Sequence, residues 1–392
     1  MTLHYEFPIN ITLAEVREVI KDDHNFIIVE KDSYTVVNYV RMGSDTFPPV
    51  IDRASAIRRE LRGLIFDTET GKVISRPYAK FFNYGERADV TDLNITESHH
   101  FLEKLDGSMI RPIPIRGHIR WGTKMGVTEV SMQAEVFVAN NLQYQKAAEY
   151  MIGIGMTPIF EWCSRQQRIV VDYPEDQLIL TAVRSNFNGR YLNHTTLSSF
   201  ASFFDIPVVS CVESHDVSKT FEENIESVRK WEDREGIVIR FHDGSMVKVK
   251  ADTYISLHRA KSMLENERDV VGLIIDEKTD DLMPLLSDDD KKKLVDFQDA
   301  VWKDIYDFWG NINNELMLIS ASGISRKDFA IKTQDSEPTM RGLIFKVWDK
   351  KEEGISLDMV KQNVYNHLSS NAQFEKTRGI LKTARWNPVV ID

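Results

Sequence analysis

The chain has 392 residues, of which 42% are hydrophobic and 28% charged, and its formal net charge is −11. This length allows two domains with sizeable cores, and the acidic total argues against indiscriminate polyanion binding without excluding a local basic groove. Two cysteines, Cys163 and Cys211, exclude a disulfide scaffold and suit a reducing cytosol. The chain does not open on a basic segment followed by an apolar run, and no apolar stretch approaches the ~20 residues of a membrane span. We therefore expect a cytoplasmic protein without a signal peptide or a membrane partner.

Residues 1–254 alternate short apolar runs with turn signals, a pattern typical of strands joined by hairpins. Strands are expected at residues 26–29, 63–66, 72–75, 158–162, 168–171 and 178–183. Helical periodicity is present near residues 13–21, 129–152 and 195–204, the last opened by a cap at Asn193 or Thr195. This mixture predicts an α+β domain of largely antiparallel sheets with flanking helices.

The character of the sequence changes after about Tyr254. From Ser256 onward the apolar residues follow a helical period, and alternating β-branched runs are scarce. Helices are expected near residues 253–265, 287–318, 325–333, 355–370 and 372–383. We therefore predict two domains, residues 1–254 and residues 255–392, of which the second is all-helical.

The stretch EKLDGS at residues 103–108 places Lys104 two residues before an acid, which a tight-turn glycine follows. This arrangement suits a lysine that becomes covalently attached to a nucleotide, although the same pattern also occurs in plain surface turns. Attack on phosphorus needs a neutral amine, and an ordinary lysine pKa of ~10.4 leaves only about one molecule in a thousand neutral at pH 7. Nearby cations and partial burial lower that pKa. The cations that could do so are Arg62, Lys124, Lys248 and Lys250.

Carboxylates are also needed, to hold ribose hydroxyls and metal-bound water. Glu161 is a candidate because it ends an apolar strand, where a charge is otherwise costly. The alternative for Glu161 is an ion pair with Arg165 or Arg168. Residues 75–83 mix basic and aromatic side chains, which can grip a nucleotide or single-stranded nucleic acid.

Residues 235–251 contain the best-defined hairpin, because an Asp-Gly pair between two apolar strands is a strong turn signal. A two-residue turn would place Ile237 opposite Lys250. Glu235, Lys248 and Lys250 would then point to one face, since side chains alternate along a strand. The alternative, for this hairpin taken alone, is a solvated strand that carries two lysines.

Five blocks of sequence together resemble the covalent nucleotidyltransferase superfamily of DNA ligases, RNA ligases and mRNA capping enzymes. More narrowly, the chain is similar to the bacteriophage tRNA-repair RNA ligases, the RNA ligase 1 family. The blocks are ELRGLIF at 60–66, SRPYAKFFN at 75–83, EKLDGS at 103–108, FEW at 160–162, and EGIVIR at 235–240 followed by KVKADTYISLH at 248–258. Met109 stands where DNA ligases and capping enzymes typically carry arginine, and the tail reads as helices rather than as an OB-fold. Both features favour the RNA ligase family.

The resemblance implies a role for each matching residue. Lys104 would be the nucleophile that forms lysyl-AMP, and Tyr254 matches a position needed for activity. Asp280, and less surely Asp281, match a metal-binding position in the helical domain, with an acidic helix cap as the alternative. Catalytic roles are also implied for Glu161 and Glu235, as ligands of ribose and metal-bound water. Contacts to the nucleotide and its phosphates are implied for Tyr39, Arg62, Lys80, Lys124, Glu161, Glu235, Lys248 and Lys250.

The family resemblance implies an ATP-dependent RNA ligase that uses Mg²⁺, or Mn²⁺ in its place, to join 5′-phosphate and 3′-hydroxyl ends through lysyl-AMP and RNA-adenylate. Its partners would be single-stranded RNA ends, such as a nicked tRNA anticodon loop, in the bacterial cytoplasm if the protein is phage-encoded. No obligate protein partner is evident. The alternatives are a DNA ligase or capping enzyme, or a catalytically silent RNA-binding protein.

A cluster of basic residues near the C-terminus is expected to face tRNA, because phosphate contacts need cations. Any one of these residues could instead be an ordinary solvated helix position. The cluster comprises Lys361, Lys376, Arg378, Lys382 and Arg385.

Overall fold

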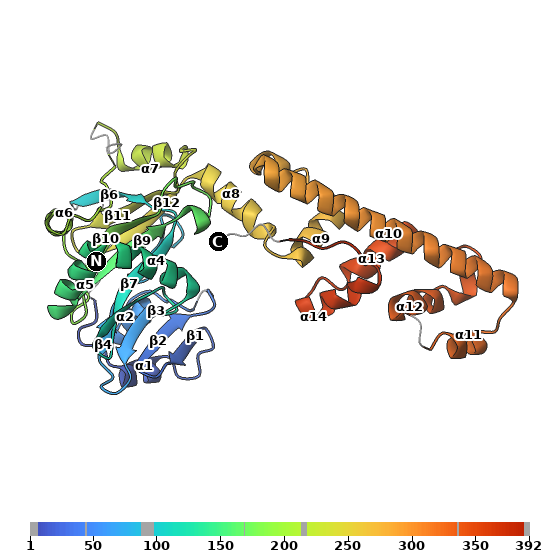
Figure 1. Ribbon diagram of the computed structural model, residues 1–392, viewed down its shortest axis with the longest axis horizontal. Helices are drawn as coiled ribbons and strands as arrows, with labels where there is room; N and C mark the ends of the chain where they lie inside the picture. The colour runs from blue at the N-terminus through green and yellow to red at the C-terminus, as the bar shows by residue number, and fades with distance from the viewer. Residues whose placement is uncertain are drawn as a thin grey trace. The chain divides into compact units, whose positions relative to one another are not determined.

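The structure, a computed structural model, describes residues 7–43, 45–87, 98–167, 169–212, 218–334 and 337–387 (Figure 1). The chain divides into two compact units, Met1–Ile255 and Ser256–Ile391, so the division lies one residue beyond the expected position. The first unit holds three four-stranded sheets, whereas the described residues of the second form only helices and turns. The predicted α+β class with a helical C-terminal region is therefore confirmed.

The first sheet is a simple antiparallel meander in the order β1-β2-β3-β4. Its strands are β1 (Phe26–Glu30), β2 (Tyr34–Tyr39), β3 (Arg62–Asp67) and β4 (Val73–Ser75). Two short helices accompany it, α1 (Leu13–Val19) and α2 (Arg53–Glu60), and α2 begins with a capping box formed by Asp52 and Ser55. Because α2 ends at Glu60, it delivers the chain directly into β3, which begins at Arg62.

The second and third sheets carry the other strands that position the site. The second has the order β10-β9-β7-β8 and is antiparallel throughout, whereas in the third, β5-β12-β11-β6, the β5–β12 pair is parallel. The strands are β5 (Phe82–Asn83), β6 (His99–Lys104), β7 (Ser108–Ile115), β8 (His118–Gly122), β9 (Met156–Cys163), β10 (Gln177–Ser185), β11 (Gly236–Phe241) and β12 (Met246–Lys250). The helices between them are α4 (Glu129–Asn140), α5 (Leu142–Gly153), α6 (His194–Phe203) and α7 (Phe221–Arg229).

The third sheet has one apolar face and one polar face. Ile237 and Ile239 of β11 and Val247 and Val249 of β12 are buried in a single core. Because side chains alternate along a strand, the even-numbered residues Gly236, Val238, Lys248 and Lys250 turn to the opposite face. The hydrophobic pattern of the hairpin therefore decides which face receives its two lysines.

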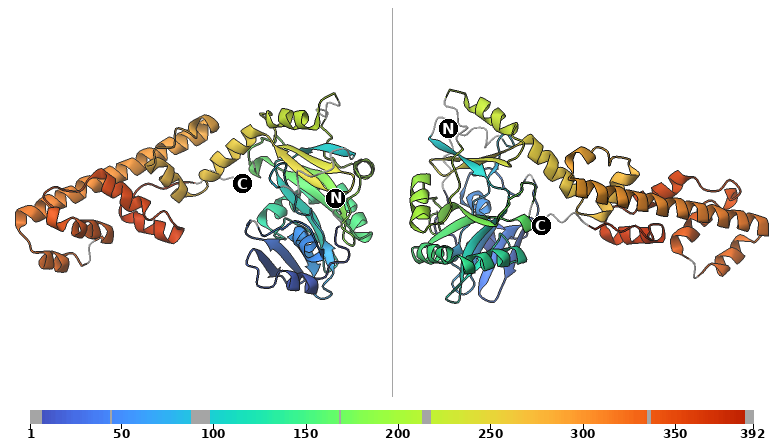
Figure 2. Two further views of the ribbon diagram at one scale, coloured as in Figure 1. Left: turned by 180° about the vertical axis from the view of Figure 1, so that it is seen from behind. Right: turned by 45° about the horizontal axis from the view of Figure 1, so that its top comes forward.

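The helices of the second unit share one hydrophobic core with the long helix α10 (Asp288–Ser322). It begins at a cap in which the Ser287 hydroxyl accepts from the Asp290 N–H, and it ends at Gly323, whose φ is +63°. Figure 2 shows α10 as one continuous helix. Its buried residues recur every three or four positions, as a single apolar stripe requires. The helices of this unit are α8 (Asp252–Met263, which begins in the first unit), α9 (Glu267–Ile275), α10 (Asp288–Ser322), α11 (Arg326–Lys332), α12 (Pro338–Lys346), α13 (Leu357–Tyr365) and α14 (Asn371–Phe374).

Several predicted elements differ from the structure. The helix expected at residues 129–152 is two helices, because the backbone of Asn141 is not helical. The helix expected at residues 372–383 is reduced to α14 and the short 3-10 turn Glu375–Gly379. Helices α2, α7, α9 and α12 were not predicted. Among the described residues, none of the helices combines the length and the apolar character that a membrane crossing needs.

The strand predicted at residues 168–171 is wrong for its described part. Residues 169–171 form bends, and the N–H groups of Val170 and Val171 donate to the Asp106 carboxylate at 2.8 Å each. Their backbone donors therefore bind a side chain instead of a neighbouring strand. Residue 168 lies outside the described residues.

The predicted register of the β11–β12 hairpin is wrong by one residue. Ile237 lies opposite Val249, not opposite Lys250. The Phe241 N–H donates to the Ser245 carbonyl at 3.0 Å, and Gly244 has a φ of +89°. The loop therefore has three residues with a left-handed glycine at its end, the second most common hairpin solution, instead of the two-residue turn.

Candidate active site

Lys104 is the last residue of β6 and lies in one row with residues of two neighbouring strands. Gly236 of β11 pairs with both Lys104 and Lys250 of β12, so the two lysines flank a residue that has no side chain. Glu235, just before β11, accepts from the Lys104 Nζ at 2.7 Å and from the Lys250 Nζ at 2.8 Å. The carboxylate is only 4% exposed, so these two contacts form with little competition from water.

Gly236 is needed for this arrangement. Its φ is +142°, and a Cβ at this position would lie 2.0 Å from the Val249 carbonyl oxygen. This irregular backbone also lets the carboxylate of Glu235 reach Lys250, although Glu235 itself precedes the strand. The predicted convergence of Glu235, Lys248 and Lys250 is thus met in part by the observed ion pair, despite the shifted register.

The turn after Lys104 is held by its acid, Asp106, which is only 2% exposed. Its Oδ1 accepts from the Tyr254 hydroxyl at 2.7 Å, and its Oδ2 accepts the two backbone N–H groups of the 169–171 loop. A Cβ on Gly107 would lie 2.3 Å from the Trp162 carbonyl oxygen, so the turn packs directly on β9. Tyr254 therefore contacts the site through Asp106 and also directly, since the Lys250 Nζ lies 4.8 Å from the centre of its ring.

Asp106 was not assigned a role from the sequence. The sequence did contain a signal for it: Asp106 is the acid two residues after Lys104, and the structure shows that it is buried. Burial, together with the charges of Glu235 and Asp106, raises the pKa of Tyr254, so its hydroxyl remains a donor.

Glu161 on β9 lies opposite Met109 of β7. Burial raises its pKa to about 7, an effect that the charge of Lys104 opposes and that of Glu235 reinforces. Of the two arginines considered as partners from the sequence, Arg165 pairs with Asp172 at 3.3 Å, and Arg168 lies outside the described residues. The Arg165 pairing is therefore not formed, and Glu161 belongs electrostatically to the Lys104 cluster.

A second group of predicted residues gathers around Tyr39, at the end of β2. The Nζ atoms of Lys80 and Lys124 lie 5.3 and 5.4 Å from the centre of its ring. Although burial alone would raise the pKa of Tyr39, the charges of Lys80, Arg62 and Lys124 lower it. The structure thus brings together residues from four separate segments as a cationic cluster, which we define as Tyr39, Arg62, Lys80 and Lys124.

The lysines of the site differ in protonation. Burial, and then the charges of Lys104, Lys80 and Lys250, lower the pKa of Lys248 to about 7. Burial would also lower the pKa of Lys104, but Glu235 and Glu161 outweigh it and the pKa is raised. The expectation that Lys104 is held partly neutral is therefore wrong for the ligand-free protein, because its nearest charged neighbour is a carboxylate at 2.7 Å.

The predicted metal residues, Asp280 and Asp281, are exposed in the turn between α9 and the 3-10 turn Met283–Leu285. They cap no helix, so that alternative is not supported. Within the part of the chain that the structure describes, no three His, Cys, Asp or Glu side chains are grouped to hold a metal. Mg²⁺ usually binds through one or two carboxylates plus substrate phosphates, and Glu161 with Glu235 fits that mode. The metal role of the two aspartates stays a prediction.

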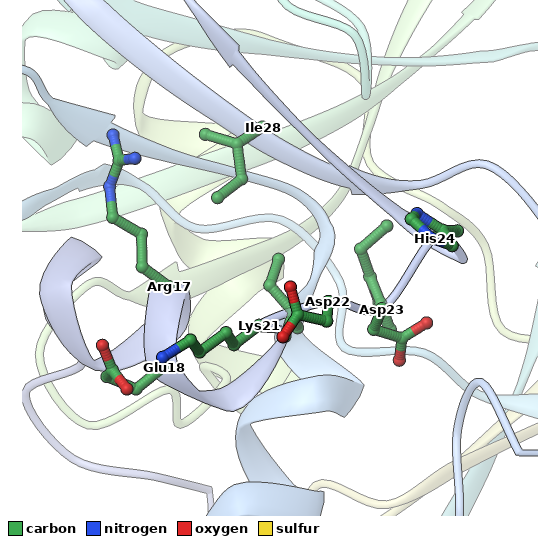
Figure 3. Close-up of a pocket in the computed structure, with 9 residues that line it drawn as sticks. Arg17, Glu18, Lys21, Asp22, Asp23, His24 and Ile28 are labelled. Carbon is green, nitrogen blue, oxygen red and sulfur yellow. The ribbon is translucent and has the colours of Figure 1, made fainter.

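A surface hollow elsewhere in the first unit holds none of the predicted site residues. It is lined by residues of α1, the loop after it and β1 (Figure 3). Two of its charges are neutralised, because Arg17 pairs with Glu30, and Asp23 pairs with Arg58 at 2.6 Å. Its mixed charge does not suit a triphosphate, unlike the charge of the cationic cluster.

Comparison with known proteins finds similarity to RNA ligases. Residues 60–254 match the sequence model of the RNA ligase family, a segment that holds all the candidate site residues of the first unit except Tyr39. A putative RNA ligase of Thermovibrio ammonificans is 29% identical over 306 residues, which cover 76% of this chain and 77% of that protein. A putative bifunctional polynucleotide kinase/RNA ligase of Autographa californica nuclear polyhedrosis virus is 27% identical over 274 residues, 64% of this chain and 37% of the relative.

More distant similarities extend to a phage protein and to solved structures. RNA ligase 1 of bacteriophage TS2126 is 27% identical over 149 residues, 34% of this chain and 36% of that protein. An archaeal ATP-dependent RNA ligase has a TM-score of 0.46 at 12% identity, with 72% of this chain and 74% of that chain covered. A Naegleria gruberi RNA ligase variant with AMP and Mn has a TM-score of 0.36 at 16% identity, with coverages of 42% and 53%.

The five sequence blocks converge on one site in the structure, and four of them lie wholly within the matched family segment, as does most of the fifth. The first of the relatives matches along three quarters of both chains. The prediction of an RNA ligase enzyme is confirmed: residues 60–254 of the chain match the RNA ligase family, and the relatives it resembles are RNA ligases by name.

Proposed function

We propose that this enzyme uses ATP to join RNA 5′-phosphate and 3′-hydroxyl ends through a covalent AMP on Lys104. The observation that carries the proposal is that Lys104 has both carboxylates and cations near it. Its Nζ donates to Glu235 at 2.7 Å, and Lys248 and Lys250 lie on the same sheet face as Lys104. The charges of Lys104 and Lys80 help to lower the pKa of Lys248, and the charge of Lys104 opposes the raised pKa of Glu161. A nucleoside triphosphate needs both groups, carboxylates for its ribose and cations for its phosphates.

In the first step, the Lys104 Nζ lone pair forms a bond to the α-phosphorus of ATP. The bond from that phosphorus to the β-phosphate oxygen breaks, and pyrophosphate leaves with the electron pair. Before this attack Lys104 must lose a proton and its ion pair with Glu235. Ribose hydroxyls that bind Glu235 would release the amine, and Glu161, with a pKa of about 7, can hold a proton near neutral pH.

The next two steps transfer the adenylate. An oxygen of the RNA 5′-phosphate attacks the phosphorus of lysyl-AMP, the N–P bond breaks, and a 5′-5′ pyrophosphate forms. The RNA 3′-hydroxyl then attacks the RNA phosphorus, and AMP leaves with the bridging electron pair. Lys248 and Lys250, on the same sheet face as Lys104, would stabilise the charge on the α-phosphate. Mg²⁺ held by Glu161, Glu235 and the phosphates would add electrostatic stabilisation of that charge.

The substrate we propose is a single-stranded RNA end, such as a nicked tRNA, recognised in part by the helical unit. The basic cluster expected there is smaller than predicted. Lys361 pairs with Glu277 at 3.2 Å, and Arg378 pairs with Glu267 at 2.7 Å, so neither charge is fully available to RNA. The exposed members without an ion pair among the described residues are Lys376, Lys382 and Arg385.

The deciding experiment is incubation of the protein with α-labelled ATP and Mg²⁺, followed by denaturing electrophoresis. A labelled protein band is expected for the wild type and for Lys146→Ala, which changes an exposed lysine of α5. Lys104→Ala and the charge-conserving Lys104→Arg should give no band. A wild type without a band would favour a silent RNA-binding protein, and a band in Lys104→Ala would place the nucleophile elsewhere.

Joining assays then show whether the enzyme joins RNA or DNA ends. Circularisation of a 5′-phosphorylated single-stranded RNA is expected, and its DNA counterpart should react more slowly. Labelling with GTP but not ATP, or joining of nicked DNA alone, would replace the proposal by a capping enzyme or a DNA ligase.

A further inference from the structure

Arg111 on β7 is a fully buried cation with no carboxylate partner among the described residues. Its guanidinium is 0% exposed and donates from Nε to the Ser75 hydroxyl at 2.9 Å, from Nη1 to the Thr123 carbonyl at 3.0 Å, and from Nη2 to the Gly63 carbonyl. All three acceptors are neutral. Burying an unpaired charge is costly, so a residue that serves packing alone would be expected to be apolar or paired.

The other two arginines among the largest fully buried side chains are each paired with a carboxylate. Arg76 and Arg184 are also 0% exposed, and both form ion pairs with the buried carboxylate of Glu60, at 3.1 and 2.7 Å. Arg111 therefore stands apart from them: its charge is satisfied by hydrogen bonds but is not neutralised.

Two of the acceptors of Arg111 are the chain neighbours of residues in the cationic cluster. Gly63 follows Arg62, and Thr123 precedes Lys124. The two backbones touch at this point, because a Cβ on Gly63 would lie 2.5 Å from the Lys124 carbonyl oxygen. Arg111 thus joins the start of β3, in the first sheet, to the turn after β8, in the second sheet.

A planar guanidinium fixes such a junction better than any other side chain. Its donors have a rigid fork geometry, so three acceptors on three segments set the distance and angle between those segments. Burial, and then the neighbouring charge of Arg62, lower the pKa of Arg111 to about 9, and it stays charged at neutral pH. The uncompensated charge also favours binding of a polyanion at the adjoining cationic cluster.

We propose that Arg111 is a positioning residue for the nucleotide: it holds Arg62 and Lys124 at the spacing that the triphosphate and the leaving pyrophosphate require, and it adds positive charge beneath them. This inference rests on the proposed function. It predicts a defect confined to steps in which the β- and γ-phosphates are bound, because Arg111 contacts neither Lys104 nor the carboxylates.

The test compares Arg111→Lys and Arg111→Gln with the wild type in three assays. Self-adenylylation gives the ATP concentration for half-maximal rate, and its pyrophosphate-driven reversal gives the same quantity for pyrophosphate. Joining of RNA that already carries a 5′-adenylate uses neither ligand. Loss of one or more hydrogen bonds to a charged group should raise both half-maximal concentrations by about tenfold to a hundredfold in Arg111→Gln, and less in Arg111→Lys.

Joining of pre-adenylylated RNA should remain close to the wild-type rate in both variants. Arg120→Gln on β8, which breaks the pair of Arg120 with Glu135 at 2.7 Å, is the matched control and should leave all three quantities unchanged. Should Arg111→Gln fail to fold in a thermal unfolding experiment, Arg111→Lys and Ser75→Ala decide. Ser75→Ala removes only the acceptor of the Arg111 Nε. It should raise the half-maximal concentrations of ATP and pyrophosphate by a smaller factor.

Two results would overturn the inference alone, given a wild type that forms the AMP adduct. One is unchanged half-maximal concentrations in the Arg111 variants. The other is a parallel loss of adenylylation and of pre-adenylylated joining, which would mean a general structural role. A wild type without an adduct would instead defeat the proposed function, and this inference with it.

Discussion

At the scale of single residues, two groups of the site, Glu161 and Lys248, have pKa values of about 7, one raised and the other lowered from its ordinary value. Burial raises that of Glu161 and lowers that of Lys248, because the charged form of each is disfavoured away from water. Both groups therefore change charge near neutral pH. As pH rises through this value, Lys248 loses a positive charge and Glu161 gains a negative one.

We predict that affinity for a non-hydrolysable ATP analogue, measured without metal, falls as pH rises through about 7. Both titrations make the site less positive, and loss of one charged phosphate contact weakens binding by about tenfold. Lys248→Arg stays charged throughout and should show a weaker pH dependence, and adding Glu161→Gln should remove the rest. Equal pH profiles for the wild type and the double variant would contradict the assignment.

The titration of Lys248 also makes the free energy of unfolding depend on pH, and the sign of that dependence can be derived. The ordinary pKa of lysine, 10.5, is lowered to about 7 for Lys248 in the folded protein. Between these values the unfolded chain binds more protons than the folded one, so the contribution of Lys248 to the free energy of unfolding rises with pH in this window. Urea unfolding of the wild type and of Lys248→Met at several pH values would measure it.

At the scale of elements, the row Lys104–Gly236–Lys250 depends on a backbone that only glycine adopts easily. We predict that Gly236→Ala destabilises the protein by about 2 kcal/mol or more, through steric overlap with β12 and a strained φ. It should also abolish AMP transfer to Lys104. Gly153→Ala is the control, since a Cβ there meets nothing within 4 Å and should be neutral or slightly stabilising. Chemical denaturation and adenylylation measure the two effects, and a folded, active Gly236→Ala would contradict the account.

In the helical unit, one buried carboxylate fastens the end of the chain to α10. Asp304 is 5% exposed and accepts from the Thr383 N–H at 2.7 Å, the Thr383 hydroxyl at 2.8 Å and the Ala384 N–H at 2.8 Å. Asp304→Ala leaves these donors without an acceptor and should cost about 3 kcal/mol. Asp307→Ala, one turn away, breaks only an exposed pair with Lys303 and should change stability by less than about 0.5 kcal/mol. Comparable losses in the two variants would contradict this role.

At the scale of the whole molecule, each compact unit has its own core. Buried residues from Ala260 to Trp386 form one hydrophobic cluster, and the first unit holds separate clusters around its sheets. All residues proposed to bind the nucleotide belong to the first unit. Chemistry on ATP and recognition of RNA should therefore be separable by mutation.

We predict that Lys376→Ala combined with Lys382→Ala weakens binding and joining of tRNA while self-adenylylation is unchanged. Both side chains are exposed, and removing two phosphate contacts should reduce the slope of affinity against salt by about two. Lys303→Ala, which already has an acidic partner, should leave RNA binding unchanged. Binding measured across a salt series decides, and an unaltered slope would rule out this surface.

Sequence patterns by themselves determined the α+β class, because hydrophobic period is a local property, whereas the candidate site residues were predicted from the resemblance to a known family. Tyr39, Arg62, Lys80 and Lys124 come from four segments; Arg62 and Lys80 stand in two of the five blocks, whereas Tyr39 and Lys124 lie outside them. Elements without a strong local period, such as α2 and α9, were missed, and the turn signal of the hairpin did not reveal which of two loop lengths would form.

Only the tertiary structure decided which charges touch. The pairing of Glu235 with both Lys104 and Lys250, the burial of Asp106 and the unpaired charge of Arg111 depend on contacts between residues far apart in the chain. Protonation follows from these contacts, since a pKa is set by burial and by the nearest charges rather than by residue type. The amino-acid sequence specifies which ionisable groups are available, whereas the distances between them, and hence their charge states, are properties of the fold.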